Sequence, residues 1–213
     1  MAFEIRNGVL INYREEPGVT EVVIPESVTS IGDEVFRGCE SLTSVIIPDS
    51  VTSIGDGAFC GCKSLASVII PDSVTSIGIW AFYGCNGLSD KDGIVIIRGV
   101  LYSYSGRAEI TIPGNVTSIE GGAFCGCKSL ASIIIPDSVT SIGYGAFCGC
   151  ESLTSVIIPD SVKTIKNGAF DECDNLNKVV YYGTEDSFKQ IEMDDDTRST
   201  LASLVKYEEK PLP

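Results

Sequence analysis

The sequence predicts a repeat protein, a solenoid of mostly parallel β-strands with short 3₁₀ or α turns. The first observation is a period of 23 residues between prolines, at Pro25, Pro48 and Pro71 and again at Pro113, Pro136 and Pro159. The second is near-identity between copies, because residues 59–78 and 124–143 differ only at Val68 against Ile133. A period of this length is typical of stacked coils that each pack on their neighbours. Duplication therefore built this chain.

Composition and charge exclude several functions. The 213 residues have a formal net charge of -14, whereas nucleic acid and anionic membrane surfaces attract clustered lysine and arginine. Histidine is absent, which removes the usual general base and the histidine-activated nucleophiles. No apolar run is long enough to span a bilayer. We expect no enzyme, no cofactor, no nucleic-acid partner and no membrane insertion.

The start of the chain bears on its location. Residues 1–30 lack the basic start followed by an apolar core that marks a secretory signal. The expected location is the cytoplasm if Met1 is the native start, and the cell surface or the exterior if the chain is processed or trimmed.

Each coil is expected to begin with a short strand, as in the stretch LTSVIIP at residues 42–48. Successive side chains of a strand point to opposite faces, so Val45 and Ile47 should point inward and Ile46 outward. Pro48 should end the strand, because proline has no backbone N–H to donate.

The second half of each coil should contain a shorter extended piece and a glycine-rich turn. Val51 and Ile54 are expected to point inward around the extended piece. The stretch GAFCGC at residues 57–62 is too short for a regular helix, and one or two turns of 3₁₀ or α character would fit it. The side chains expected to fill the remaining core are Ala58, Phe59, Cys62 and Leu65.

Two hairpins are expected. Residues 3–13 alternate around Asn7-Gly8, a dipeptide that favours a two-residue hairpin turn, and this hairpin should cover the first coil. Pro71 and Pro113 are 42 residues apart, and the inserted stretch GIVIIRGVLYSYSG echoes the N-terminus. It is either a hairpin spliced into a continuous solenoid or a boundary between two shorter stacks. The same cysteine pattern resumes after it, which favours continuity.

After residue 176 the repeat decays into a C-terminal cap. The expected elements are a strand at 178–182, a short helix after an N-cap at Thr184, a second short helix starting at 194–196, and a last strand at 205–207.

The whole chain, residues 1–213, is expected to form a single domain. Its segments are an N-terminal hairpin cap (1–18), a first repeat block (19–87), an irregular hairpin-containing coil (88–112), a second repeat block (113–176) and the C-terminal cap (177–213).

The repeat I-P-x-S-V-T-S-I-G-x-x-A-F-x-G-C-x-S-L, in residues 19–87 and 106–176, resembles the BspA-type leucine-rich repeat. Leucine is sparse, and Val, Ile, Phe and Cys take most inward positions. The resemblance implies a curved right-handed leucine-rich-repeat solenoid with a parallel sheet on one face. Several members are bacterial cell-surface proteins credited with adhesion and with binding host or bacterial proteins. The family has no catalytic or cofactor residues to carry over.

Cysteine recurs at one repeat position, which indicates a buried column rather than a disulfide framework. The members are Cys39, Cys62, Cys85, Cys127, Cys150 and Cys173. Cys125 and Cys148 should lie nearer the surface on adjacent coils, where oxidation could join them. Four thiolates on these two coils would suit zinc. Residues two apart on a turn point in divergent directions, however, so we predict no metal site.

The candidate partner-binding face is a row of apolar residues at the middle outward position of each long strand: Val23, Ile46, Ile69, Ile134 and Ile157. Thr111 interrupts this row. A contiguous apolar patch with a polar rim often marks a partner site. The alternative is that β-branched residues simply favour strands.

Three aromatic residues replace smaller residues of the repeat and are candidate anchors for a partner: Trp80, Tyr83 and Tyr144. The alternative is that they fill packing gaps.

The sequence therefore predicts a non-catalytic protein–protein interaction module, with adhesion or binding of a host or bacterial protein implied by the resemblance. The alternative hypothesis is a cytoplasmic structural or assembly scaffold that acts through self-association.

Overall fold

The computed structural model describes residues 3–106 and 108–210, apart from the side chain of Glu109. The chain forms two compact units, residues 1–91 and 92–213. Each unit is a stack of coils that starts with an antiparallel hairpin. The single domain expected over residues 1–213 stays a prediction, and each unit is described by itself.

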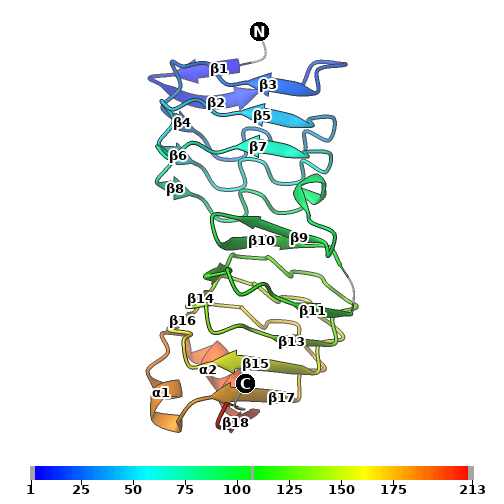
Figure 1. Cartoon of the computed structure of the whole chain (residues 1–213), viewed down its shortest axis with the longest axis vertical. Helices are drawn as coiled ribbons and strands as arrows, with labels where there is room; N and C mark the ends of the chain where they lie inside the picture. The colour runs from blue at the N-terminus through cyan, green and yellow to red at the C-terminus, as the bar shows by residue number, and fades with distance from the viewer. Residues whose placement is uncertain (1–2, 107, 211–213) are drawn as a thin grey trace. The chain divides into compact units, whose positions relative to one another are not determined.

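The first unit has two sheets (Figure 1). Its elements are β1 (Phe3–Arg6), β2 (Val9–Tyr13), β3 (Glu21–Val23), β4 (Ser30–Ile31), β5 (Ser44–Ile46), β6 (Ser53–Ile54), β7 (Ser67–Ile69), β8 (Ser76–Ile77) and the 3₁₀ turn η1 (Asn86–Leu88). The hairpin β1–β2 starts a sheet in the order β1-β2-β4-β6-β8, in which β2 pairs with β4 in parallel. The longer strands form a parallel sheet in the order β3-β5-β7. Each coil thus contributes one strand to each sheet.

The second unit repeats this plan. Its strands are β9 (Ile94–Ile97), β10 (Val100–Tyr104), β11 (Glu109–Thr111), β12 (Ser118–Ile119), β13 (Ser132–Ile134), β14 (Ser141–Ile142), β15 (Ser155–Pro159), β16 (Thr164–Ile165), β17 (Lys178–Tyr182) and β18 (Val205–Tyr207). The hairpin β9–β10 pairs with β12 and starts the sheet β9-β10-β12-β14-β16, and the other sheet runs β11-β13-β15-β17-β18. The hairpin expected in the inserted stretch is confirmed.

Two short helices lie between β17 and β18: α1 (Glu185–Lys189) and α2 (Asp195–Ala202). Thr184 caps α1, since its hydroxyl accepts a hydrogen bond from the Ser187 backbone N–H, and Asp194 caps α2 in the same way through Thr197. Both predicted helix starts are confirmed. With the hairpin at its beginning and the α/β segment at its end, the predicted fold class of a mostly parallel β-solenoid is confirmed.

Hydrogen bonds between equivalent residues join one coil to the next. The Thr52 backbone N–H donates to the Thr29 carbonyl oxygen at 2.9 Å, and the Thr75 N–H donates to the Thr52 oxygen at 2.9 Å. The Thr52 hydroxyl makes a second bond to the same Thr29 oxygen at 3.2 Å. In the second unit Thr140 bonds to Thr117 by the same two groups. The 23-residue period of the sequence is therefore the period of the backbone ladder.

A column of stacked phenylalanine rings forms the centre of each core. The Phe36 and Phe59 rings are 5.0 Å apart between centroids and 4° from parallel, and Phe82 continues the column 5.2 Å from Phe59. At this separation parallel rings are offset, which is a favoured aromatic geometry. Tyr13 of the hairpin covers the first ring of the column, with centroids 4.8 Å apart. The corresponding cover in the second unit is Tyr104 on Phe124.

The alternation expected in the stretch LTSVIIP is confirmed. Val45 and Ile47 are buried and Ile46 is exposed. Val51 and Ile54 are buried, as is the whole set expected to complete the core, Ala58, Phe59, Cys62 and Leu65.

The glycine-rich turn differs from a helix for a conformational reason. The Cys60 N–H donates to the Gly57 oxygen and the Cys62 N–H to the Phe59 oxygen, which are bonds of 3₁₀ type. Gly57 and Gly61, however, have φ of 58° and 75° in the left-handed region. These two residues break the stretch into separate turns, so the predicted 3₁₀ character is present without a continuous helix.

Candidate functional site

The predicted partner face of the first unit lies on the β3-β5-β7 sheet. The register sets Val23 beside Ile46 and Ile46 beside Ile69, and all three side chains are between 45% and 64% exposed. Neighbouring strands of a sheet are about 4.8 Å apart, so the three side chains form one continuous apolar stripe. Polar residues flank the stripe at Glu21 and Ser67, both exposed.

In the second unit the stripe is less complete. Ile134 is 57% exposed on β13 and lies beside the exposed Thr111 of β11. These two residues, with Ile110 and Ser132, line a shallow hollow of about 360 Å³. Ile157 is only half-buried, and Val180, its neighbour on β17, is buried. The outward row therefore loses exposure toward the C-terminal strands, a change that the repeat pattern does not signal.

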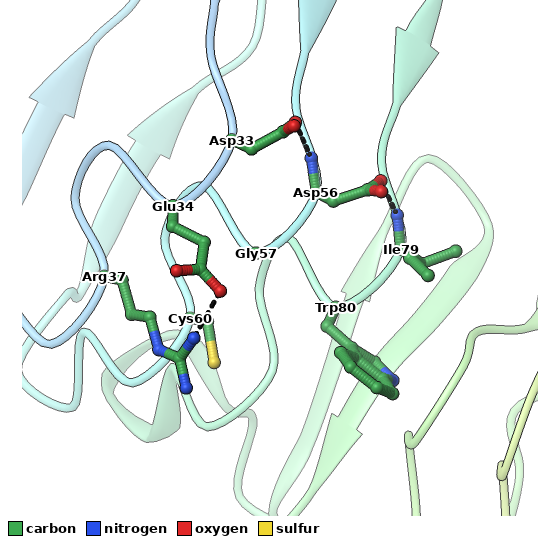
Figure 2. A pocket seen from close by; sticks show the side chains of 8 residues that line it. All are labelled: Asp33, Glu34, Arg37, Asp56, Gly57, Cys60, Ile79 and Trp80. Atoms are coloured by element: carbon green, nitrogen blue, oxygen red, sulfur yellow. Dashed lines mark hydrogen bonds and ion pairs between the residues drawn. The ribbon is translucent and has the colours of Figure 1, made fainter. Parts of the chain in front are cut away.

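A second feature of the first unit is a hollow of about 310 Å³ beside Trp80 (Figure 2). Its lining residues are Asp33, Glu34, Arg37, Asp56, Gly57, Cys60, Ile79 and Trp80. The indole of Trp80 is 47% exposed and forms one wall. Glu34 and Arg37 form an ion pair on the opposite side, and Cys60 lies between the two walls.

Two aspartates of the hollow link successive coils. Asp33 Oδ1 accepts a hydrogen bond from the Asp56 backbone N–H at 2.8 Å, and Asp56 Oδ1 accepts one from the Ile79 N–H at 2.9 Å (Figure 2). Each carboxylate is thereby held at a defined place along the wall. Burial is the main cause of the raised pKa of the Cys60 thiol, and the Arg37 guanidinium opposes this rise.

Trp80 has a backbone φ of 58° in the left-handed region. Gly57, Gly145 and Gly168, which occupy the same repeat position, have φ between 57° and 67°. For a bulky side chain this conformation costs about 1–2 kcal/mol, and glycine avoids that cost. Trp80 is therefore a costly residue for its backbone position.

Tyr83 and Tyr144, the other predicted aromatic anchors, do not line the hollow beside Trp80. Tyr83 is half-buried. Tyr144 is 48% exposed in the second unit, at the repeat position that Ile79 occupies in the first. The repeat pattern predicted Trp80 as an anchor but not the four charged residues around its hollow. Aligning the coils could have found them, because Asp33 and Asp56 precede the position of Trp80 in their own coils.

The cysteine column is present, and its thiols make hydrogen bonds that the sequence did not reveal. The Cys62 thiol donates to the Phe36 carbonyl oxygen at 3.0 Å, and the Cys150 thiol donates to the Phe124 oxygen at 3.1 Å. Each thiol thus bonds to the preceding coil as well as filling the core. The column members are buried except Cys127 and Cys173, which are half-buried.

The outer cysteines of the second unit are Cys125, which is exposed, and Cys148, which is half-buried. Cys125 is one of the groups that raise the pKa of the Cys148 thiol. All nine cysteines belong to the described residues, and none of them is in a disulfide there. Within the described ranges, no three His, Cys, Asp or Glu side chains are grouped so that they could hold a metal ion.

We predict slow alkylation of Cys148 near neutral pH. Burial, followed by the neighbouring Cys125 thiol, raises the pKa of Cys148 to about 11. Only the thiolate reacts, so the alkylation rate of native protein with iodoacetamide should rise about tenfold per pH unit until the pH approaches that value. Peptide mass spectrometry of timed samples measures the rate at this residue. A rate that levels off by about pH 10 would show that the thiol is not perturbed.

In the part of the chain that the structure covers, no helix combines the length and the apolar character needed to cross a membrane.

Comparison with known proteins identifies the repeat. The chain is similar to a leucine rich cell surface protein of Faecalibacterium prausnitzii, with 31% identity over 83% of this chain and 63% of that one and a TM-score of 0.45. It is also similar to the leucine rich repeat protein of T. pallidum, with 28% identity over 94% of this chain and 89% of that one and a TM-score of 0.44. A Bacteroides ovatus leucine-rich repeat protein has 29% identity over 84% of this chain and 52% of its own, with a TM-score of 0.45.

The chain thus spans less than two thirds of the Faecalibacterium and Bacteroides proteins. No match was found among curated proteins. The model of the BspA type leucine rich repeat region matches residues 12–92 and 95–194 with six copies. Leucine-rich repeat proteins are commonly protein-interaction modules and typically non-enzymatic scaffolds. The chain belongs to the BspA type leucine rich repeat family.

Proposed function

We propose that this chain is a non-catalytic protein-binding module that contacts its partner through the outward face of its long strands. The observation that carries the proposal is the exposed stripe of Val23, Ile46 and Ile69 on β3, β5 and β7. Three neighbouring β-branched side chains at 45–64% exposure form an apolar surface that water disfavours. Covering such a stripe with a partner's apolar side chains releases about 25 cal/mol for each Å² buried.

The proposed partner is a host or bacterial protein. Membership of the family supports adhesion to a host or bacterial protein, with the chain displayed at a cell surface. Self-association is the second candidate, and it has its own supporting observation. Ile46 and Ile134 occupy equivalent positions and are both exposed, so each unit presents a similar apolar position to a second copy.

Charge placed on the stripe should abolish partner binding while leaving the fold intact. We expect the double variant Ile46→Lys/Ile134→Lys to unfold at the same denaturant concentration as the parent, because both side chains are largely exposed. Light scattering gives the mass of parent and variant in solution, and a pull-down compares the protein partners that they retain. A dimeric parent and a folded monomeric variant would identify self-association.

The matched control is Thr52→Lys/Thr140→Lys. It adds the same charge at exposed positions just before β6 and β14 and removes the two hydroxyl bonds to the preceding coil. The backbone bond to that coil remains, as it does at Lys163, which occupies the equivalent position and donates to the Thr140 oxygen at 2.8 Å. The control should behave as the parent in both measurements. If parent, stripe variant and control have one mass and retain the same partners, the strand face is not the binding surface.

A further inference from the structure

The hollow beside Trp80 has the composition of a binding site for a positively charged side chain. We propose that it takes the guanidinium group of an arginine presented by a basic protein partner, at a site separate from the apolar stripe. The volume of about 310 Å³ is at the lower end of small-ligand sites, which suits a single side chain.

The aromatic wall supplies the first part of recognition. Trp80 is nearly half exposed, and Figure 2 shows its indole beside the hollow rather than packed into the core. A guanidinium stacks on the face of an indole, because the negative face of the ring attracts the cation. Arginine is preferred over lysine for such contacts, because its planar group is less strongly hydrated.

The charges around the hollow supply the second part. Its lining contains three carboxylates, of Asp33, Glu34 and Asp56, against the one guanidinium of Arg37. Arg37 is already paired with Glu34. Within the described residues, Asp33 and Asp56 each use Oδ1 to accept a backbone N–H, and Oδ2 makes no hydrogen bond. Carboxylate oxygens that accept from a guanidinium make strong, directed bonds.

The second unit shows that the fold alone does not require these residues. The positions that carry Asp33, Asp56 and Ile79 in the first unit carry Gly121, Tyr144 and Asn167 in the second, none of which is acidic. The position of Trp80 is glycine in all three coils of that unit, Gly122, Gly145 and Gly168. The combination of an indole and neighbouring carboxylates therefore occurs in the first unit and not at the equivalent positions of the second.

Trp80 is also the chain's one tryptophan, so its fluorescence and its indole N–H signal in NMR report on this hollow alone. The probe is the peptide acetyl-Gly-Arg-Arg-Gly-amide, added to the full chain at low salt. The comparison peptide replaces both arginines by citrulline, which has the same shape without the charge. We expect a saturable change with the arginine peptide and none with the citrulline peptide, and the change should weaken as salt is added.

Two variants test the two parts of recognition. Asp56→Asn keeps the oxygen that accepts from the Ile79 N–H but removes the charge, and should weaken binding about threefold. Trp80→Gly restores the residue that other coils carry and should weaken binding about fivefold or more, measured through the NMR signal of the Gly57 amide. The matched control Asp49→Asn removes one charge from an exposed turn of the same unit and should bind as the parent.

The outcomes separate the proposal from its alternatives. Equal binding of both peptides would mean that the hollow does not recognise the positive charge, and would overturn the proposal. Equal weakening by Asp56→Asn and Asp49→Asn would mean that only net charge matters, which also overturns it. Because the strand stripe is a different surface, Ile46→Lys/Ile134→Lys should keep the full response to the arginine peptide.

Discussion

Replacing Phe59 by alanine should lower the free energy of unfolding of the first unit by about 3–5 kcal/mol. Phe59 is fully buried and stacks on Phe36 at 5.0 Å and on Phe82 at 5.2 Å, so its removal empties the middle of the column. Each ring pair lost adds about 0.5–1.5 kcal/mol to the cost of the lost apolar burial. Urea denaturation followed by Trp80 fluorescence measures the change, because this tryptophan lies in the same unit.

Ile46→Ala is the control for that experiment. Ile46 belongs to a neighbouring strand of the same unit but points outward, and surface substitutions of this kind change stability by less than about 0.5 kcal/mol. Similar shifts for Phe59→Ala and Ile46→Ala would contradict the assignment of the phenylalanine column as the centre of the core.

Replacing Gly143 by alanine should destabilise the second unit by about 3 kcal/mol. The Gly143 N–H donates to the Ile119 oxygen of the preceding coil at 2.8 Å, which brings the two backbones together. A methyl group on Gly143 would lie 2.7 Å from the carbonyl carbon of Glu120 and closer still to the backbone nitrogen of Gly121. Backbone atoms cannot rotate away, so the coils must separate. Thermal unfolding followed by circular dichroism measures the loss.

Gly126→Ala separates this steric effect from the ordinary cost of replacing glycine. Gly126 has φ of 70°, and a methyl group there would meet nothing within 4 Å. Its replacement should cost only the conformational strain of the left-handed region, about 1 kcal/mol. A larger loss for Gly126→Ala than for Gly143→Ala would contradict the close approach of the coils as the reason for Gly143.

Most of the coil could be predicted from the sequence, because the alternation of inward and outward side chains recurs in the repeat. The alternation in LTSVIIP places Val45 inward and Ile46 outward, and both hairpins carry a glycine turn followed by a matching tyrosine. Caps at Thr184 and Asp194 follow from the preference of short polar side chains for free backbone N–H groups. These are local properties, and a single stretch of sequence contains them.

The hollow and the fading stripe are not local. Asp33, Asp56 and Trp80 come from three different coils and meet only because the coils stack. Ile157 has the same neighbours in sequence as Ile46, yet it is less exposed, because exposure depends on what lies beside a strand rather than on the strand itself. The bonds from the column thiols to phenylalanine oxygens likewise join residues 26 apart. Cysteine at that position is therefore a linking residue as well as an apolar one.

The coil-to-coil bonds between equivalent threonines have a consequence for how such a gene changes. Thr52 donates to Thr29 and accepts from Thr75 through the same groups, so the two sides of this coil are complementary to each other. Loss or gain of one 23-residue copy of such a coil would therefore leave two compatible surfaces in contact. The number of coils can therefore change without any new interface having to arise. The hairpins, whose tyrosines cover the phenylalanine columns, stay at the start of each unit.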